Sequence, residues 1–200
     1  MADRVWYVSY GSNLLRARFL TYLTGGPIPG ATDGQAQSGS RDPSLPSADG
    51  PVEIDRTLVF AKKSARWGGG GVAFLDPHEQ PATPTMGRAW NITCQQLEDV
   101  FRQENRQAEP IAIDLGHLAA DGYLDGYSSS YGRLLFLGPG QDGLPLVTLT
   151  GAARPTDANP AHPSYLGVMA EGLSECWDLS QTEAEHYLAS LPQRPSGPGG

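Results

Sequence analysis

The feature that most constrains the fold is an abrupt change of pattern near the start of the chain. Residues 4–10 read RVWYVSY, which is rich in β-branched and aromatic side chains and predicts a strand. Gly11, Ser12 and Asn13 follow at once, and the apolar positions beyond them recur at helical spacing up to Gly25. We therefore expect a strand, a tight turn and a helix that is capped by the Asn13 side chain.

A junction of this kind can bind an anion. The first amide groups of a helix have no partner within the helix, and the helix dipole places its positive end beside them. Gly11 lets a ligand approach the backbone closely, while Ser12 and Asn13 add side-chain donors. The same residues are equally typical of an ordinary strand-to-helix loop, so both interpretations stay open. Neither a Gly-Lys-Ser/Thr nor a GxGxxG pattern occurs at this turn, which excludes the usual nucleotide-phosphate loops there.

The remaining pattern predicts one α+β domain, a small mixed β-barrel or sheet with flanking helices, over residues 1–191. Further strands are expected at residues 52–61, 71–75, 85–92, 131–137 and 144–150, the last two as a hairpin. Further helices are expected at residues 93–105, 163–172 and 181–191. We assign no element to two long loops, at about 27–51 and 106–130, and we expect a flexible tail at 192–200.

Composition narrows the class of protein and of partner. The net charge of -8 disfavours nucleic acids and anionic membranes as partners, and no apolar run reaches the length of a membrane span. Cys94, Cys176 and four scattered histidines form neither a disulfide framework nor a metal-binding spacing. We therefore expect a cytoplasmic protein that binds a small molecule and uses no metal or cofactor, and a homodimer remains compatible with this composition.

The helix predicted at residues 93–105 carries one acid on its apolar side. At 100° per residue, Glu104 falls on the stripe formed by three apolar residues, Leu97, Val100 and Phe101. Glu98 and Arg102 are spaced to pair on the flank, as on a solvated helix face. The pattern alone favours an ordinary explanation, in which the helix ends and Glu104 turns into water. If Glu104 is instead partly buried beside a pocket, it is a suitable base for an amine substrate.

Four segments, in this order, resemble the γ-glutamylcyclotransferase family. YVSYGSNL at residues 7–14 is similar to the family signature, and WGGGGVAF at residues 67–74 is similar to its Trp-x-Gly-Gly strand entry. MGRAW at residues 86–90, with the helix that ends in Gln-Glu at 103–104, resembles the Gly-x-x-Trp strand and the catalytic helix. Tyr165 resembles a tyrosine that opens the next helix. Together the segments cover about half of the chain.

The resemblance implies a small mixed β-barrel with flanking helices and a reaction that releases a γ-glutamyl group as 5-oxoproline. It implies Glu104 as the general acid/base, with no cofactor and no metal. It also implies a set of substrate-binding residues: Tyr10, Gly11, Ser12, Asn13, Leu14, Tyr131 and Tyr165. Asn105 stands where the animal enzymes often have glycine, and the two long loops exceed a minimal member of the family, so the leaving amine or amino acid stays open.

In such a reaction the nucleophile is the substrate's own α-amine, which attacks its own γ-carbonyl. Because that attack is intramolecular, the protein needs only to fold the substrate and move protons. Two other interpretations share the same pocket: a binding module that performs no reaction, and an enzyme that removes a γ-glutamyl protecting group from a biosynthetic amine. An interaction role through the Gly- and Pro-rich loops has no motif to support it.

Overall fold

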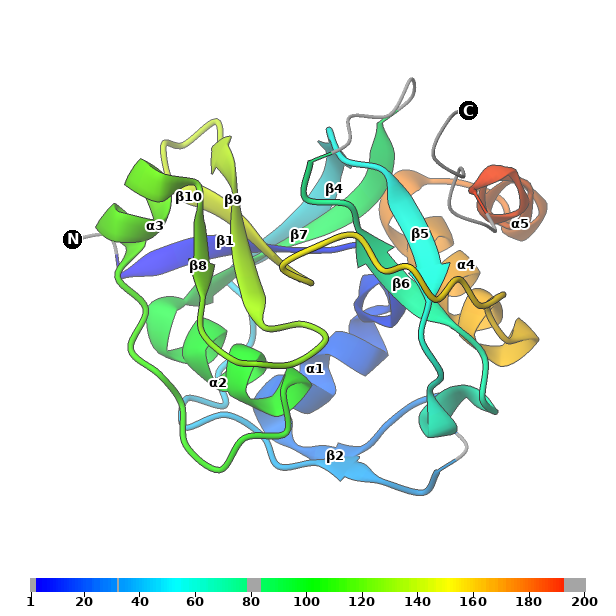
Figure 1. The fold of residues 1–200 in the computed structure, drawn as a ribbon, viewed down its shortest axis with the longest axis horizontal. Coiled ribbons are helices and arrows are strands. Elements are labelled where there is room, and N and C mark those ends of the chain that lie inside the picture. The colour runs from blue at the N-terminus through cyan, green and yellow to red at the C-terminus, as the bar shows by residue number, and fades with distance from the viewer. Residues whose placement is uncertain (1–2, 32, 79–83, 193–200) are drawn as a thin grey trace.

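The computed structural model describes residues 3–31, 33–78 and 84–192, and its centre is a six-stranded mixed sheet. The strands lie in the order β4-β7-β1-β10-β9-β8 (Figure 1). They are β1 (Arg4–Ser9), β4 (Ala48–Ile54), β7 (Thr85–Thr93), β8 (Tyr123–Asp125), β9 (Arg133–Pro139) and β10 (Pro145–Thr150). The first strand pairs antiparallel with β7 and parallel with β10, so the segment that leads into the Gly11 turn occupies the middle of the sheet.

Two short ribbons and the helices complete the fold. One ribbon pairs β5 (Leu58–Ala61) with β6 (Val72–Leu75), and the other pairs β2 (Gly26–Pro27) with β3 (Ala36–Gln37). The helices are η1 (Ser12–Leu14), α1 (Arg16–Thr24), η2 (Ala65–Trp67), α2 (Cys94–Glu104), α3 (Leu115–Asp121), α4 (Pro163–Trp177) and α5 (Gln181–Ser190). This is the predicted α+β class, with a central mixed sheet and flanking helices.

The first strand is buried on both faces because two apolar clusters meet across it. Val5 and Tyr7 point into a cluster built with α1 and α2, while Val8 and Tyr10 point into a cluster built with α4 and α5. In Figure 1, α1 and α2 lie together below the sheet, and α4 and α5 lie to its right. Alternating side chains of one strand thus join both halves of the core, which is what the period of two requires.

Several predicted elements were correct in kind and position. The expected hairpin is formed by β9 and β10, and the strand at 85–92 is β7. Thr93 and Gln96 form a capping box at the start of α2, and Ser180 and Glu183 form another at the start of α5. In each box, the side-chain oxygen of each residue accepts a hydrogen bond from the backbone amide of the other. Because these residue types occur at a fixed spacing, the two helix starts could be predicted from the sequence.

Other predictions were wrong. The strand expected at 52–61 is divided, since β4 ends at Ile54 and β5 begins at Leu58 in a different sheet. The loop expected at 106–130 contains α3 and β8, and the loop expected at 27–51 contains β3 and the start of β4. Asp114 caps α3 by accepting hydrogen bonds from two backbone amides, and Gly122 ends it in a left-handed conformation. The predicted tail lies, from residue 193 onward, outside the described residues.

Candidate functional site

Glu104 is the last residue of α2, and its side chain is partly buried against the turn that follows β1. Its Oε1 atom accepts hydrogen bonds from Asn13 Nδ2 at 2.9 Å and from the Tyr22 hydroxyl at 2.6 Å. Among the described residues none donates a hydrogen bond to Oε2. The carboxylate is therefore held by one oxygen, and the explanation in which Glu104 turns into water is wrong.

Asn13 does not cap a helix, contrary to the sequence prediction. It lies within the short helix η1, and α1 begins later, after Leu15, with no side-chain cap. Asn13 is only 6% exposed and its amide group reaches Glu104 instead. Its Oδ1 atom has no hydrogen-bond partner among the described residues, so a buried acceptor remains beside the carboxylate. Such a buried acceptor is costly unless a ligand or a water molecule donates a hydrogen bond to it.

Tyr22 donates a hydrogen bond to Glu104, and Arg18 donates one to Tyr22. Neither residue was predicted from the sequence. Arg18 lies on α1 at 2% exposure; its Nη2 donates to the Tyr22 hydroxyl at 2.7 Å and its Nη1 to Thr21 Oγ1 at 3.1 Å. Burial raises the pKa of Tyr22 well above its usual value; Arg18 opposes that rise and Glu104 adds to it. The Tyr22 hydroxyl therefore keeps its proton and donates a hydrogen bond to Glu104. The sequence did carry a signal, because Arg18 and Tyr22 are four residues apart on a helix with apolar neighbours.

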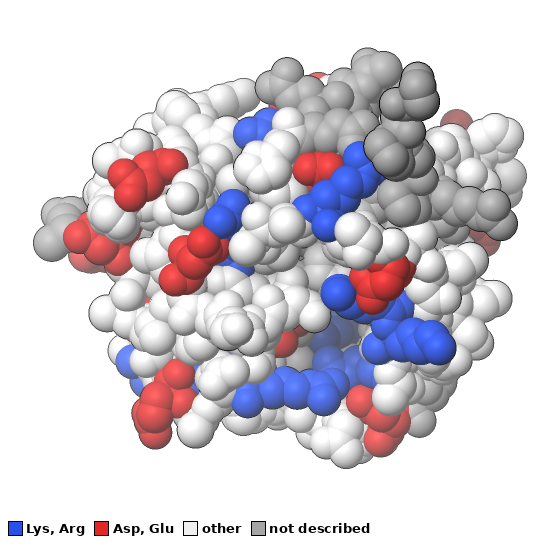
Figure 2. Space-filling view, in the orientation of Figure 1, with Lys and Arg blue, Asp and Glu red and all other residues white. Residues whose placement is uncertain are grey.

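Glu104 and the turn share one pocket of about 150 Å³. This is below the roughly 300–1,000 Å³ of pockets for drug-sized ligands, so it suits a small molecule. Its walls include every predicted substrate-binding residue except Leu14: Tyr10, Gly11, Ser12, Asn13, Tyr131 and Tyr165. Further lining residues were not predicted, among them Tyr7, Arg18, Arg66, Gln103 and Arg106. Figure 2 shows a hollow on this face with basic side chains gathered around it.

Leu14 is the one predicted binding residue that the structure places elsewhere. Its side chain is fully buried and packs in the apolar cluster with α4 and α5, and its backbone amide bonds to the Gly11 carbonyl. Leu14 therefore stabilises the turn by packing in the core and does not line the pocket. Because the sequence pattern marks only a continuous segment, it could not separate the residues that face a ligand from the one that faces the core.

Three tyrosines line the pocket, and their hydroxyls form hydrogen bonds with the protein backbone. Tyr10 donates to the Leu149 carbonyl at 2.6 Å, and Tyr131 donates to the Ala73 carbonyl at 2.7 Å. The Tyr165 hydroxyl accepts from the Ala73 amide at 3.2 Å, and burial raises the pKa of Tyr165 to about 12. Burial also raises the pKa values of Tyr10 and Tyr131. These hydroxyls are therefore neutral at physiological pH and shape the wall without adding charge.

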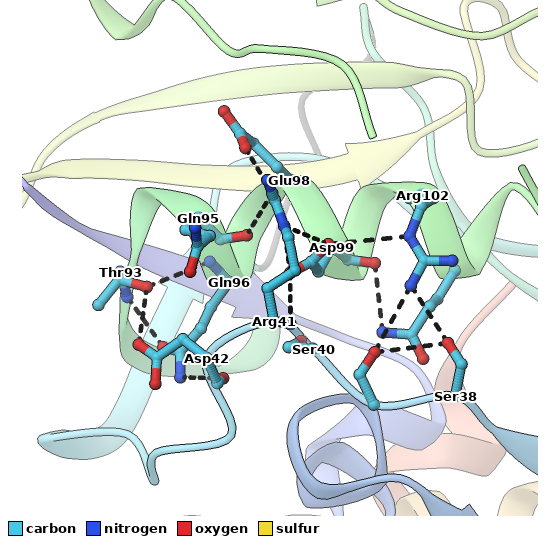
Figure 3. A network of polar contacts seen from close by, with 12 residues as sticks. Ser38, Ser40, Arg41, Asp42, Thr93, Gln95, Gln96, Glu98, Asp99 and Arg102 are labelled. Carbon is cyan, nitrogen blue, oxygen red and sulfur yellow. Dashed lines mark hydrogen bonds and ion pairs between the residues drawn. The ribbon is translucent and has the colours of Figure 1, made fainter. Parts of the chain in front are cut away.

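The position of α2, and hence of Glu104, is fixed by the segment that precedes β4 (Figure 3). Arg41 donates from its backbone amide and its Nε to the Asp99 carboxylate, at 2.9 and 3.1 Å, and from Nη2 to Glu98 at 2.7 Å. Asp99 is 1% exposed and also lies 3.7 Å from the Arg102 guanidinium. The expected pair of Glu98 with Arg102 is thus replaced by two separate contacts, because this segment covers the flank that was expected to be solvated.

Metal binding and membrane insertion find no support in the described residues. Within them no three His, Cys, Asp or Glu side chains gather closely enough to hold a metal ion. No helix in the same part of the chain has both the length and the apolar character needed to cross a bilayer.

Comparisons with known proteins bear mainly on the fold. No protein family model matches the chain. Histone deacetylase 5 from Arabidopsis thaliana is 31% identical over 208 residues, which cover 96% of this chain and 31% of that protein; the chain thus spans about a third of the length of this relative. A solved gamma-glutamyl cyclotransferase superposes with a TM-score of 0.54 and 17% identity, and the match covers 98% of this chain and 93% of that one. An uncharacterized protein from Homo sapiens superposes with a TM-score of 0.52 and 17% identity, and the match covers 100% of this chain and 93% of that one.

Proposed function

Because the chain has the γ-glutamylcyclotransferase-like fold, we propose that it releases 5-oxoproline from a γ-glutamyl amide, with Glu104 as general acid/base. The observation that carries the proposal is the fixed position of Glu104. One carboxylate oxygen is held by Asn13 and Tyr22, and the side chain lines a small pocket together with the turn at Gly11. A positioned carboxylate beside a ligand-sized hollow is what proton transfer to and from an amine requires.

The reaction proceeds in two steps. The substrate's α-amine attacks its own γ-carbonyl carbon, which forms a C–N bond and closes a five-membered ring. Glu104 takes the proton that the attacking nitrogen loses and delivers it to the leaving nitrogen as the original amide C–N bond breaks. The products are 5-oxoproline and a free amine. Since attack within one molecule carries a large effective molarity, the pocket contributes by folding the substrate and by transferring the proton.

The turn supplies groups of the right type for the rest of the substrate. The backbone amide of Asn13 donates no hydrogen bond to a described residue, so it can hold the developing oxyanion or the α-carboxylate. Asn13 Oδ1, which also lacks a partner in the described part of the chain, can accept a hydrogen bond from the attacking amine. Asn13 would then contact both the substrate and the general base.

The proposal is tested by incubating the purified protein with several γ-glutamyl amides and measuring 5-oxoproline. Glu104→Gln should lower kcat by about 10² to 10⁴-fold, the usual contribution of a general acid/base. Glu171→Gln is the matched control, because it removes the same charge from an exposed position of α4 outside the pocket. Near wild-type turnover by Glu104→Gln, with its fold intact, would contradict the assigned role.

The same assay separates the other interpretations. A protein that binds a γ-glutamyl compound without releasing 5-oxoproline would be the non-catalytic binding module. Rapid release from a γ-glutamylated biosynthetic amine, with poor turnover of γ-glutamyl amino acids, would support the deprotecting role. Histone deacetylase 5 is matched over 31% of its length only, so the activity in its name describes a much larger protein. An acetylated lysine peptide is included as a substrate, and release of acetate would favour that activity over ours.

A further inference from the structure

Arg18 is a buried charge to which the proposed reaction assigns no part. It is almost completely buried, and none of the described carboxylates lies within ion-pair distance of it. Its acceptors are the neutral hydroxyls of Thr21 and Tyr22, and its Nε atom has no hydrogen-bond partner in the described part of the chain. Because burying a charge is costly unless it is paired, stability alone does not account for an arginine at this position.

The Arg18 guanidinium is held by its own helix. Nη1 donates to Thr21 Oγ1 at 3.1 Å, and that hydroxyl donates in turn to the Arg18 backbone carbonyl at 2.8 Å. Nη2 donates to the Tyr22 hydroxyl at 2.7 Å, and the guanidinium carbon lies 4.5 Å from the centre of the Tyr22 ring. Residues 18, 21 and 22 are three and four apart on α1, so their side chains are neighbours on its surface. These contacts need no ligand.

The chemistry of arginine determines where the Tyr22 hydroxyl directs its proton. A guanidinium has donors and no acceptor, so the Tyr22 oxygen must accept the hydrogen bond from Arg18. The single hydroxyl proton is then free for another acceptor, and Glu104 Oε1 lies 2.6 Å away. Arg18 and Glu104 are thus joined through one hydroxyl group, with a positive charge at one end and a carboxylate at the other.

Hydrogen bonds in such a series strengthen one another. Each bond polarises the next, and the effect is larger in a buried site than in water. Burial raises the pKa of Tyr22 and the charge of Arg18 opposes that rise, so Arg18 makes the hydroxyl a better donor to Glu104. Asn13 Nδ2 donates to the same Oε1 atom at 2.9 Å. The hydrogen bond that Arg18 strengthens is therefore one of the two that hold the carboxylate.

We propose that Arg18 is a positioning residue, which acts through Tyr22 to hold Oε1 of Glu104 and so leaves Oε2 for the substrate. This rests on the proposed function, in which Glu104 transfers the proton. Arg18 then governs the rate of proton transfer rather than the binding of substrate, although its side chain also lines the pocket. A residue that only stabilised the fold would not act on kcat and KM in this selective way.

The first test measures kcat and KM for the release of 5-oxoproline from a γ-glutamyl amide. Arg18→Met removes the charge and the donors without adding an oxygen or nitrogen acceptor. We expect kcat to fall by about tenfold, as when an outer group that orients a reacting side chain is lost, while KM changes by less than about twofold. Arg18→Lys keeps a cation that only donates, and it should recover part of the loss. Lys63→Met removes a positive charge from an exposed position outside the pocket and should change neither constant.

Urea unfolding tests the same coupling without any turnover. Glu104→Gln should lower the unfolding midpoint less in the Arg18→Met variant than in the wild type, because the attraction between Arg18 and the carboxylate is already lost there. This difference should become smaller when Tyr22→Phe is present in all the proteins compared, since the hydroxyl that links the two residues is then missing.

Three results would overturn the proposal. In the first, Arg18→Met raises KM and leaves kcat unchanged, so that Arg18 only binds the substrate. In the second, Glu104→Gln lowers the midpoint equally with and without Arg18. In the third, the difference persists in full with Tyr22→Phe, so that Arg18 acts by its charge alone. If the wild type releases no 5-oxoproline, the proposed function fails, and the midpoints by themselves decide whether Arg18 acts on Glu104 through Tyr22.

Discussion

Replacing Gly11 with alanine tests whether the turn after β1 is shaped by the space that Tyr165 occupies. Gly11 has a φ of -115°, which lies outside the left-handed region that favours glycine. A Cβ atom at this position would lie 2.6 Å from the Tyr165 hydroxyl oxygen and 3.7 Å from the ring carbon that carries it. Tyr165 is 3% exposed and packs edge-on against Trp67, with ring centroids 5.0 Å apart. The ring therefore has little freedom to move away.

The expected magnitude follows from those distances. Gly11→Ala should lower the free energy of unfolding by about 1–3 kcal/mol, the usual cost of overpacking a buried site. Tyr165→Phe alone should cost about 0.5–1.5 kcal/mol, because the Ala73 amide loses its acceptor. In the double variant the alanine meets Ala73 Cβ at 3.5 Å and the ring carbon at 3.7 Å, which are both ordinary contact distances, so its own cost should nearly vanish. The two substitutions should therefore show a favourable coupling energy of about 1–3 kcal/mol.

The assay is urea unfolding of the wild type, both single variants and the double variant, with the free energies combined as a double-mutant cycle. The slope of each transition should stay constant, since the surface exposed on unfolding hardly changes. Additive costs, within about 0.5 kcal/mol, would show that the hydroxyl does not obstruct the new methyl group and would refute this account of the turn.

Two further predictions concern charged groups. Tyr22→Phe removes the hydroxyl that accepts from Arg18 and donates to Glu104, so the free energy of unfolding should fall by about 1.5–3 kcal/mol; an unchanged urea midpoint would contradict these contacts. The Arg133 guanidinium holds the pKa of Asp125 below its usual range, so the stability it contributes is present at neutral pH and is lost as pH falls below about 4. The stability difference between wild type and Asp125→Asn should accordingly be seen at pH 7 and disappear near pH 2, and a difference that persists there would refute it.

The parts of the fold that could be predicted are those that local physics determines. The strand at residues 4–10 could be predicted because its side chains enter two apolar clusters and are therefore mostly apolar. The start of α2 could be predicted because Thr93 and Gln96 form a capping box. The strand expected at 52–61 was misjudged because both of its halves have strand-like sequences. Only the pairing partners, β7 for one and β6 for the other, reveal the break.

The candidate site was predictable only in outline. Glu104 could be singled out because a carboxylate on the apolar side of a helix is unusual. In the structure, Asn13 and Tyr22 donate hydrogen bonds to it. Asn13 was expected to cap a helix because its side chain serves that role in many turns, but a partner 91 positions away competes for the same amide group. No local pattern could indicate that Arg106 lines the pocket, since its left-handed backbone and the pocket form only in the folded chain.

The one-sided anchoring of Glu104 constrains the proposed reaction. Two donors engage Oε1, so Oε2 is the carboxylate oxygen that the described residues leave open to a ligand. If the proposed reaction takes place here, both of its nitrogen atoms have to come within hydrogen-bonding distance of that one oxygen. That requirement favours a curled substrate over an extended one.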